Sequence, residues 1–226
     1  MTDNAPKWTK SEEVDPEFAR TVFNPDYDER RAANLAFQDC ALLEAYYATQ
    51  NQKLPGRSRI LEFGCELTRG SYWLADAGPL SVTDIILEEL IASAEHLKRR
   101  TPPANVVELR FLRHGKDIEV VAPCDLLYSA LSAKRTPPTV LTHILSLLLA
   151  KVTIGGVALL HAPTQHRHCH LMVEGTLEFD DLHIIPQWKL SELLEQLGFE
   201  IILIQEDTCF RTSDIVYHTL LAQRLA

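Results

Sequence analysis

Residues 60 to 74 read Ile-Leu-Glu-Phe-Gly-Cys-Glu-Leu-Thr-Arg-Gly-Ser-Tyr-Trp-Leu, and the prediction of the fold starts from them. The apolar run from Ile60 to Phe63 is typical of a strand that is covered on both faces, and Gly64 ends it. The residues from Tyr72 to Leu74 then begin an apolar helical face. A strand that leads into a helix through a glycine-containing turn is typical of α/β domains that bind nucleotides at the carboxyl edge of the sheet.

A carboxylate follows at the spacing that such a domain needs. The run Leu80-Ser-Val-Thr-Asp84 predicts a second strand that ends at Asp84, twenty positions after Gly64. This spacing places Asp84 where the hydroxyls of a ribose would need an acceptor. The alternative is that Asp84 caps the helix predicted to begin near Leu87.

Composition excludes several classes of protein. The chain has 226 residues, 46% of them apolar and 23% charged, which is most simply one globular domain. No apolar run approaches the ~20 residues that cross a bilayer, so no membrane partner is predicted. The formal net charge of −9 argues against nucleic acid as a partner, because binding its phosphates requires clustered Lys and Arg.

The cysteines and the first residues indicate the compartment. The five cysteines, at positions 40, 65, 124, 169 and 209, are scattered and include no C-x-x-C pair. They are interpreted as reduced thiols. Residues 1–13 are polar and acidic, without the apolar segment of a signal peptide. A cytoplasmic location is therefore expected.

From residue 59 onward, predicted strands alternate with predicted helices. The fold class expected is α/β, a Rossmann-like seven-stranded, mainly parallel sheet with helices on both faces. Two β-rich runs near the end are separated by only nine residues, too few for a helical crossover, so they are predicted to pair as an antiparallel hairpin. Gly155-Gly156 is predicted to mark the end of the preceding segment, just before the fifth strand begins. The strands are expected near 59–63, 80–84, 105–112, 125–129, 156–161, 199–205 and 215–221, and the helices near 69–77, 87–99, 139–151 and 188–197.

The chain before residue 55 is predicted to be a separate part. Residues 1–54 are expected to form an arm and a helix, capped by Asp26 or Asp28, that cover the carboxyl edge of the sheet as a lid. Residues 55–226 are expected to form the main domain.

Several motifs together resemble the class I S-adenosylmethionine-dependent methyltransferases, in particular bacterial enzymes that act on small molecules. Leu61-Glu-Phe-Gly-Cys65 and Arg69 match the first motif of that family, and Val82-Thr-Asp-Ile85 matches its acidic second-strand motif. The segment Lys151-Val-Thr-Ile-Gly-Gly156 is similar to its Gly-Gly turn, and the likeness extends over roughly residues 57–224. The chain departs from the family at Glu66 and Thr68, where the family has glycines.

The resemblance implies a cofactor, a substrate and a set of site residues. The cofactor would be S-adenosylmethionine, and the substrate a small molecule with an oxygen or nitrogen nucleophile. Ser129 would flank the sulfonium, and Glu62 would contact the amino end of the cofactor, unless Glu62 is only a turn carboxylate. The cofactor-binding residues implied are Glu62, Gly64, Cys65, Glu66, Arg69, Asp84, Ile85 and Ser129.

Glu66 distinguishes between ligands by its charge. A carboxylate at the start of a helix would repel a pyrophosphate that competes for the helix N–H groups, which counts against NAD, FAD and nucleoside triphosphates. S-adenosylmethionine has no phosphate and is cationic, so Glu66 is compatible with it. The alternative is that Glu66 caps a helix in a fold that no longer binds cofactor. Such a silent relative would serve as a binding or oligomerisation partner. Under either interpretation, a homodimer is the assembly considered.

Histidines supply the candidates for acid and base chemistry. His161 and His183 are predicted to act as general acid or base, because neutral imidazole can take a proton from a hydroxyl or amine. For His161 the alternative is a hydrogen-bonded core residue. The run His166-Arg-His-Cys-His170 places three histidines on one face of an extended chain, but a solvated loop is the preferred interpretation and no metal site is predicted.

Overall fold

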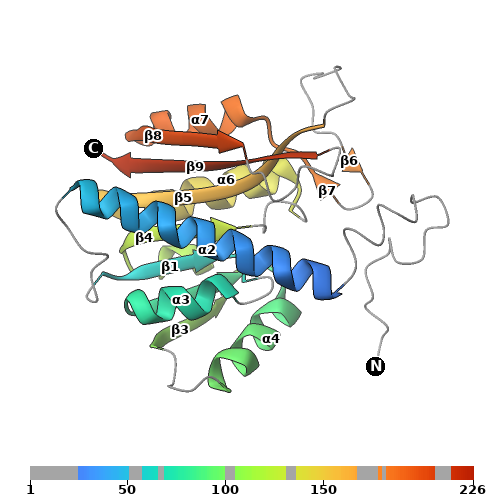
Figure 1. Cartoon of the computed structure of the whole chain (residues 1–226). Helices are drawn as coiled ribbons and strands as arrows, with labels where there is room; N and C mark the ends of the chain where they lie inside the picture. The colour runs from blue at the N-terminus through green and yellow to red at the C-terminus, as the bar shows by residue number, and fades with distance from the viewer. Residues whose placement is uncertain are drawn as a thin grey trace.

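The computed structural model describes residues 25–50, 58–65, 69–99, 105–130, 136–166, 178–179, 182–206 and 215–226. Within them, seven strands form one sheet in the order β3-β2-β1-β4-β5-β9-β8 (Figure 1). Neighbours among β1 to β5 run parallel, whereas β9 is antiparallel to both β5 and β8. The strands are β1 (Ile60–Phe63), β2 (Leu80–Asp84), β3 (Val106–Phe111), β4 (Cys124–Ala130), β5 (Val152–His166), β8 (Phe199–Glu206) and β9 (Ile215–Arg224).

Helices cover both faces of this sheet. One hydrophobic cluster packs α2, α3 and α4 on one face, and a second cluster packs α5, α6 and α7 on the other. Two short strands, β6 and β7, pair in a small sheet of their own. The remaining bounds are α2 (Pro25–Thr49), α3 (Arg69–Ala77), α4 (Leu87–Lys98), α5 (Gly115–Glu119), α6 (Pro138–Leu149), β6 (Glu178–Phe179), β7 (Leu182–His183) and α7 (Gln187–Gln196).

The predicted architecture is confirmed. The mainly parallel seven-stranded sheet, the helices on both faces and the antiparallel terminal hairpin are all present. Successive side chains of a strand point to opposite faces of the sheet, and both faces are covered here, so apolar residues are needed at successive positions. In β1, Ile60 packs into the cluster under α2 to α4, and Leu61 packs into the cluster on the opposite face.

The prediction for the start of the fifth strand was wrong. The strand β5 begins at Val152 rather than near residue 156, and Gly155 and Gly156 lie inside it. The register against β4 shifts between Cys124 and Leu126, so β5 carries extra residues there. Gly155 accommodates them with a φ of 82°, a conformation that residues with a Cβ rarely adopt.

Helix α2 lies across one face of the sheet (Figure 1). Its buried side chains Leu43, Tyr46 and Tyr47 join the cluster that also contains residues of β1, β2 and β4. Residues 1–24 and 51–57 are outside the described part, so the lid and the division at residue 54 stay predictions. Among the described residues, the helices are too short or too polar to span a membrane.

Candidate functional site

The turn after β1 is built around Gly64. This residue has a φ of 81°, and its N–H donates to the carbonyl oxygen of Thr83 at 3.0 Å. A glycine is required because a Cβ disfavours that conformation. The turn leads toward α3, which begins at Arg69. The backbone here therefore joins the carboxyl ends of β1 and β2.

Glu62 lies at the end of β1 and is only 2% exposed. Its Oε2 atom accepts a hydrogen bond of 2.5 Å from the Ser71 hydroxyl of α3. Burial raises the pKa of Glu62 to about 8, the hydrogen bond from Ser71 opposes this rise, and the nearby charge of Asp84 adds to it. Near neutral pH the Glu62 carboxyl is therefore largely protonated.

Asp84 braces the same turn from the end of β2. Its Oδ2 atom accepts hydrogen bonds from the N–H of Cys65 at 2.9 Å and from the Cys65 thiol at 3.2 Å. Its Oδ1 atom accepts one from the N–H of Ile86 at 2.8 Å. Asp84 is 4% exposed. Because an ionised carboxylate offers about four acceptor positions, these donors leave little free capacity.

The structure brings Glu62 and Asp84 together on one face. Glu62 pairs with Val82 across β1 and β2, and Asp84 follows Val82 by two residues. Side chains alternate along a strand, so both carboxyls point to the side covered by α2, α3 and α4. The two acids therefore flank the Gly64 turn on adjacent strands.

A third buried carboxylate, Asp39 of α2, was missed by the sequence analysis. Its Oδ2 atom accepts a hydrogen bond of 2.8 Å from the hydroxyl of Tyr128, which pairs with Glu62 across β1 and β4. Asp39 and Tyr128 are 2% and 3% exposed. Burial, followed by the charge of Asp39, raises the pKa of Tyr128 well above its ordinary value. An acidic residue one helical turn before Leu43, on the apolar face, was the available signal.

The other predicted cofactor-binding residues are distributed around these. Ser129 is buried and alternates with Tyr128, so its side chain points to the opposite face, where Ile85 also packs. Arg69 begins α3, but its side chain is outside the described part. Glu66 and Thr68, the two departures from the family motif, also lie outside it.

The two histidines predicted to act in catalysis have different settings. His161 is 1% exposed, and its ring stacks on Tyr217 with centroids 5.4 Å apart. His183 lies in β7, and its side chain is outside the described part. His166 ends β5, and the rest of the histidine run falls beyond the described residues. Among the described residues there is no group of three metal-binding side chains.

A third histidine, His218 of β9, was also missed. Its Nδ1 atom lies 2.6 Å from the hydroxyl oxygen of Thr164, and that hydroxyl donates to the carbonyl oxygen of Val216 at 3.1 Å. Burial lowers the pKa of His218, and the charge of Glu206 opposes this. Thr164 lies beyond the strand expected near 156–161, so only the pairing of β5 with β9 could reveal the contact.

Known proteins resemble this chain in structure rather than in sequence. No protein-family model matches the sequence, and no curated protein does. Solved structures do match. Magnesium protoporphyrin IX methyltransferase from Synechocystis PCC 6803, with bound S-adenosylhomocysteine, superposes with a TM-score of 0.62 at 15% identity. The match covers 92% of this chain and 98% of that one.

The sheet order is the deciding observation. Three strands on one side of β1, namely β4, β5 and β9, separate it from the edge strand β8, and β9 is antiparallel to its neighbours. The chain has the class I methyltransferase fold.

Two further matches show the range of proteins that share this fold. The 1,6-didemethyltoxoflavin-N1-methyltransferase of Burkholderia thailandensis has a TM-score of 0.56 at 14% identity, covering 93% of this chain and 84% of that one. The [4+2]-cyclase SpnF has a TM-score of 0.61 at 15% identity, covering 76% of this chain and 77% of that one. Identities this low show the fold alone.

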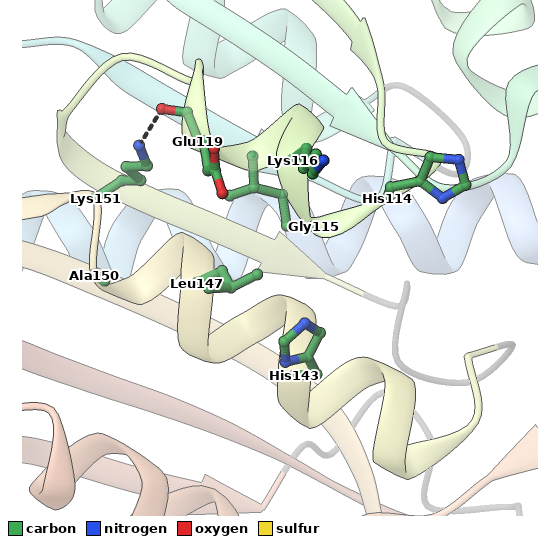
Figure 2. A pocket seen from close by; sticks show the side chains of 9 residues that line it. His114, Gly115, Lys116, Glu119, His143, Leu147, Ala150 and Lys151 are labelled. Carbon is green, nitrogen blue, oxygen red and sulfur yellow. Dashed lines mark hydrogen bonds between the residues drawn. The ribbon is translucent and has the colours of Figure 1, made fainter.

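The structure also has a cavity of about 610 Å³, whose lining residues are drawn in Figure 2. It is formed between α5 and α6, and the Lys151 ammonium at one end donates to the carbonyl oxygen of Glu119 at 2.7 Å. His114, Lys116 and His143 also line it. This cavity is on the face of the sheet opposite to Glu62 and Asp84. A smaller cavity of about 250 Å³ includes Arg59 and lies at the amino ends of the strands.

Proposed function

We propose that this protein binds S-adenosylmethionine at the carboxyl ends of β1 and β2 and transfers its methyl group to a small molecule. The acceptor atom would be an oxygen or a nitrogen. The observation that carries the proposal is the placement of Glu62 and Asp84 on one face, on either side of the Gly64 turn. The fold supports it, because the matched structures of this fold include methyltransferases with S-adenosylhomocysteine bound.

The two carboxyl groups of Glu62 and Asp84 suit this cofactor chemically. Asp84 would accept a hydrogen bond from one ribose hydroxyl at the acceptor position that Cys65 and Ile86 leave open, and a second hydroxyl would displace the Cys65 thiol. Glu62 would hold the positively charged amino end, and a cation beside it would favour its ionised form. Two buried carboxyls would be a poor setting for a phosphate. When bound, S-adenosylmethionine supplies an electrophilic methyl group on its sulfonium.

The residues of this chain would act mainly by positioning. In this proposal none of the described site residues forms a bond to the methyl group. Holding the acceptor in line with the methyl carbon and excluding water would provide much of the rate enhancement. The burial of Glu62 and Asp84, at 2% and 4% exposure, is consistent with a dry site.

Calorimetric titration with S-adenosylmethionine and S-adenosylhomocysteine tests the proposal. We expect saturable binding of both, and a loss of about ten- to hundredfold in affinity for Asp84→Asn, because hydrogen bonds to a charged group are worth about 1.5–3 kcal/mol. Asp76→Asn, on the exposed side of α3, is the matched control and should bind normally. Circular dichroism checks that Asp84→Asn still folds. Equal affinity for the two variants would exclude Asp84 as the ribose acceptor.

A second candidate function is a silent relative that keeps the fold without the cofactor. The hydrogen bonds to Asp84 from Cys65 and Ile86 favour it, because they occupy the acceptor that a ribose would need. The glycines lost at Glu66 and Thr68 favour it too. In that case neither ligand would produce heat or a thermal shift, while Glu66→Gly would restore binding.

A further inference from the structure

We infer that His218, held in place by Thr164, is the general base that accepts the proton of the methyl acceptor. This inference rests on the proposed function and narrows its substrate class. A base is needed only when the nucleophile has a proton to lose. The acceptor would therefore be a hydroxyl or an amine, and not a carboxylate, which is already ionised at neutral pH.

A β-bulge in β5 creates the contact between the two residues. Pro163 pairs with Tyr217 and Gln165 pairs with Val216, so Thr164 is the extra residue between them. A bulge changes the direction of a side chain, and bulges are frequent beside active sites. Here the hydroxyl of Thr164, which is 2% exposed, lies 2.6 Å from Nδ1 of His218.

The inferred role assigns one tautomer to His218. In it the single proton of the Thr164 hydroxyl is donated to the carbonyl oxygen of Val216, which can only accept. The short contact to His218 is then satisfied when Nδ1 carries the proton and donates to Thr164. Nε2 keeps its lone pair. This is the arrangement that a general base requires, with one ring nitrogen oriented by a partner and the other able to accept.

The register of the sheet places His218 at the carboxyl edge. The pairing of β4 with β5 ends at Ala130 and His161, and His218 pairs with the next residue of β5, Ala162. His218 therefore lies beyond the last residue of β4, at the edge where ligands of parallel sheets bind. Ser129, which is expected to flank the sulfonium, is the residue before Ala130.

The charges around His218 suit a base that works near neutral pH. Partial burial lowers its pKa from the ordinary 6.5, so the ring is neutral at pH 7 and can accept a proton. Glu206 of β8 pairs with His218 and favours the imidazolium that forms. His161 of β5 is the other titratable group that acts on it, and it disfavours the charged form.

The chemical step balances with this assignment. A lone pair of the acceptor's oxygen or nitrogen forms the new bond to the methyl carbon. The carbon–sulfur bond breaks, and its electron pair stays on sulfur. The proton of the acceptor moves to Nε2 of His218 and is later released to water, because His218 is not fully buried. His161, at 1% exposure, is much less able to exchange a proton with solvent.

Two measurements on the full chain test the inference. Nitrogen NMR of the imidazole rings at pH 7.5 should show His218 with a protonated Nδ1 and a bare Nε2, and Thr164→Val should lose this preference while Thr164→Ser keeps it. Methyl-labelled S-adenosylmethionine is then incubated with a panel of phenols, catechols, amines and carboxylic acids. Transfer should occur to a hydroxyl or an amine only.

The matched variants are His218→Asn and, as control, His143→Asn on the exposed surface of α6. Asparagine can still donate to Thr164 but cannot accept the proton, so kcat should fall about a hundredfold or more with unchanged affinity for S-adenosylmethionine. The fall in rate below the pKa of His218 should also disappear. A protonated Nε2, transfer to carboxylates, no transfer at all, or full activity of His218→Asn would each overturn the inference. Absence of S-adenosylmethionine binding would instead overturn the proposed function, and this role with it.

Discussion

At the scale of single residues, Glu62 has an unusual environment for an acidic side chain. It is a carboxyl on an internal strand with 2% exposure, one hydrogen bond from Ser71 and a second acid nearby. Desolvation disfavours its ionised form, so its pKa rises from 4.5 to about 8. A buried carboxyl of this kind reduces stability when it must ionise. Such a cost is typical of residues that bind ligands rather than of residues that stabilise the fold.

This leads to a prediction for Glu62→Gln. Between pH 4.5 and about 8 the folded protein binds more protons at this site than the unfolded chain does, so the free energy of unfolding falls as the pH rises through that window. The loss should be on the order of a few kcal/mol. Denaturant unfolding at pH 5, 6, 7 and 8 should show a flatter dependence for Glu62→Gln, which keeps an acceptor for Ser71. Glu195→Gln, on the surface of α7, should keep the wild-type dependence. Parallel curves for the wild type and Glu62→Gln would contradict the assignment.

At the scale of secondary structure elements, α3 approaches β4 very closely. A Cβ on Gly70, in the first turn of α3, would lie 2.9 Å from Cε1 of Tyr128. The Tyr128 ring is fixed from its other end by the hydrogen bond to Asp39 of α2. One glycine therefore allows α2, α3 and β4 to meet beside Glu62, and no side chain can replace it without moving one of them.

Gly70→Ala should accordingly destabilise the protein by about 1–3 kcal/mol, the usual cost of overpacking, even though alanine is the better helix former. Denaturant unfolding gives the value, and hydrogen exchange should show faster exchange in α2. Gly115→Ala is the matched control, because its Cβ would meet Leu147 and His143 at ordinary contact distances of 3.5 and 3.6 Å. A similar stability for both variants would mean that Tyr128 can move freely.

At the scale of the whole molecule, an acidic chain surrounds an acidic site. The formal net charge is −9. The carboxyls of Asp39, Glu62 and Asp84 are all buried on the side of the sheet that α2, α3 and α4 cover. A cationic ligand suits such a site better than an anionic one. The proton on Glu62 then becomes a competitor of the ligand.

Binding of S-adenosylmethionine should therefore release a proton. Its amino group stays charged below a pKa of about 7.7–8.0, so between pH 5.5 and 7 the affinity should rise with pH, by up to about tenfold per unit. Calorimetry in two buffers with different ionisation enthalpies measures the proton released. Glu62→Gln should bind more weakly and without this dependence. An affinity that stays constant over this range would show that Glu62 does not ionise on binding.

The sequence by itself determined the architecture. Short apolar runs bounded by glycines predicted the strands, and the nine-residue gap between the last two runs predicted the antiparallel hairpin. Both features can be found in a short stretch of sequence. It also singled out Glu62 and Asp84, since strand ends in a parallel sheet meet at one edge. The start of β5 was missed because Gly155 and Gly156 suit a bulge as well as a stop.

Only the tertiary structure decided what surrounds these residues. Burial by surrounding elements raises the pKa of Glu62. The hydrogen bond from Tyr128 to Asp39 and the contact of Thr164 with His218 each join residues that are far apart in the chain. Each depends on strand register or helix packing, where a shift of one residue would turn the side chain to the other face. Local patterns in a sequence fix which elements form, whereas the environment of a side chain is set by elements that pack against it from elsewhere.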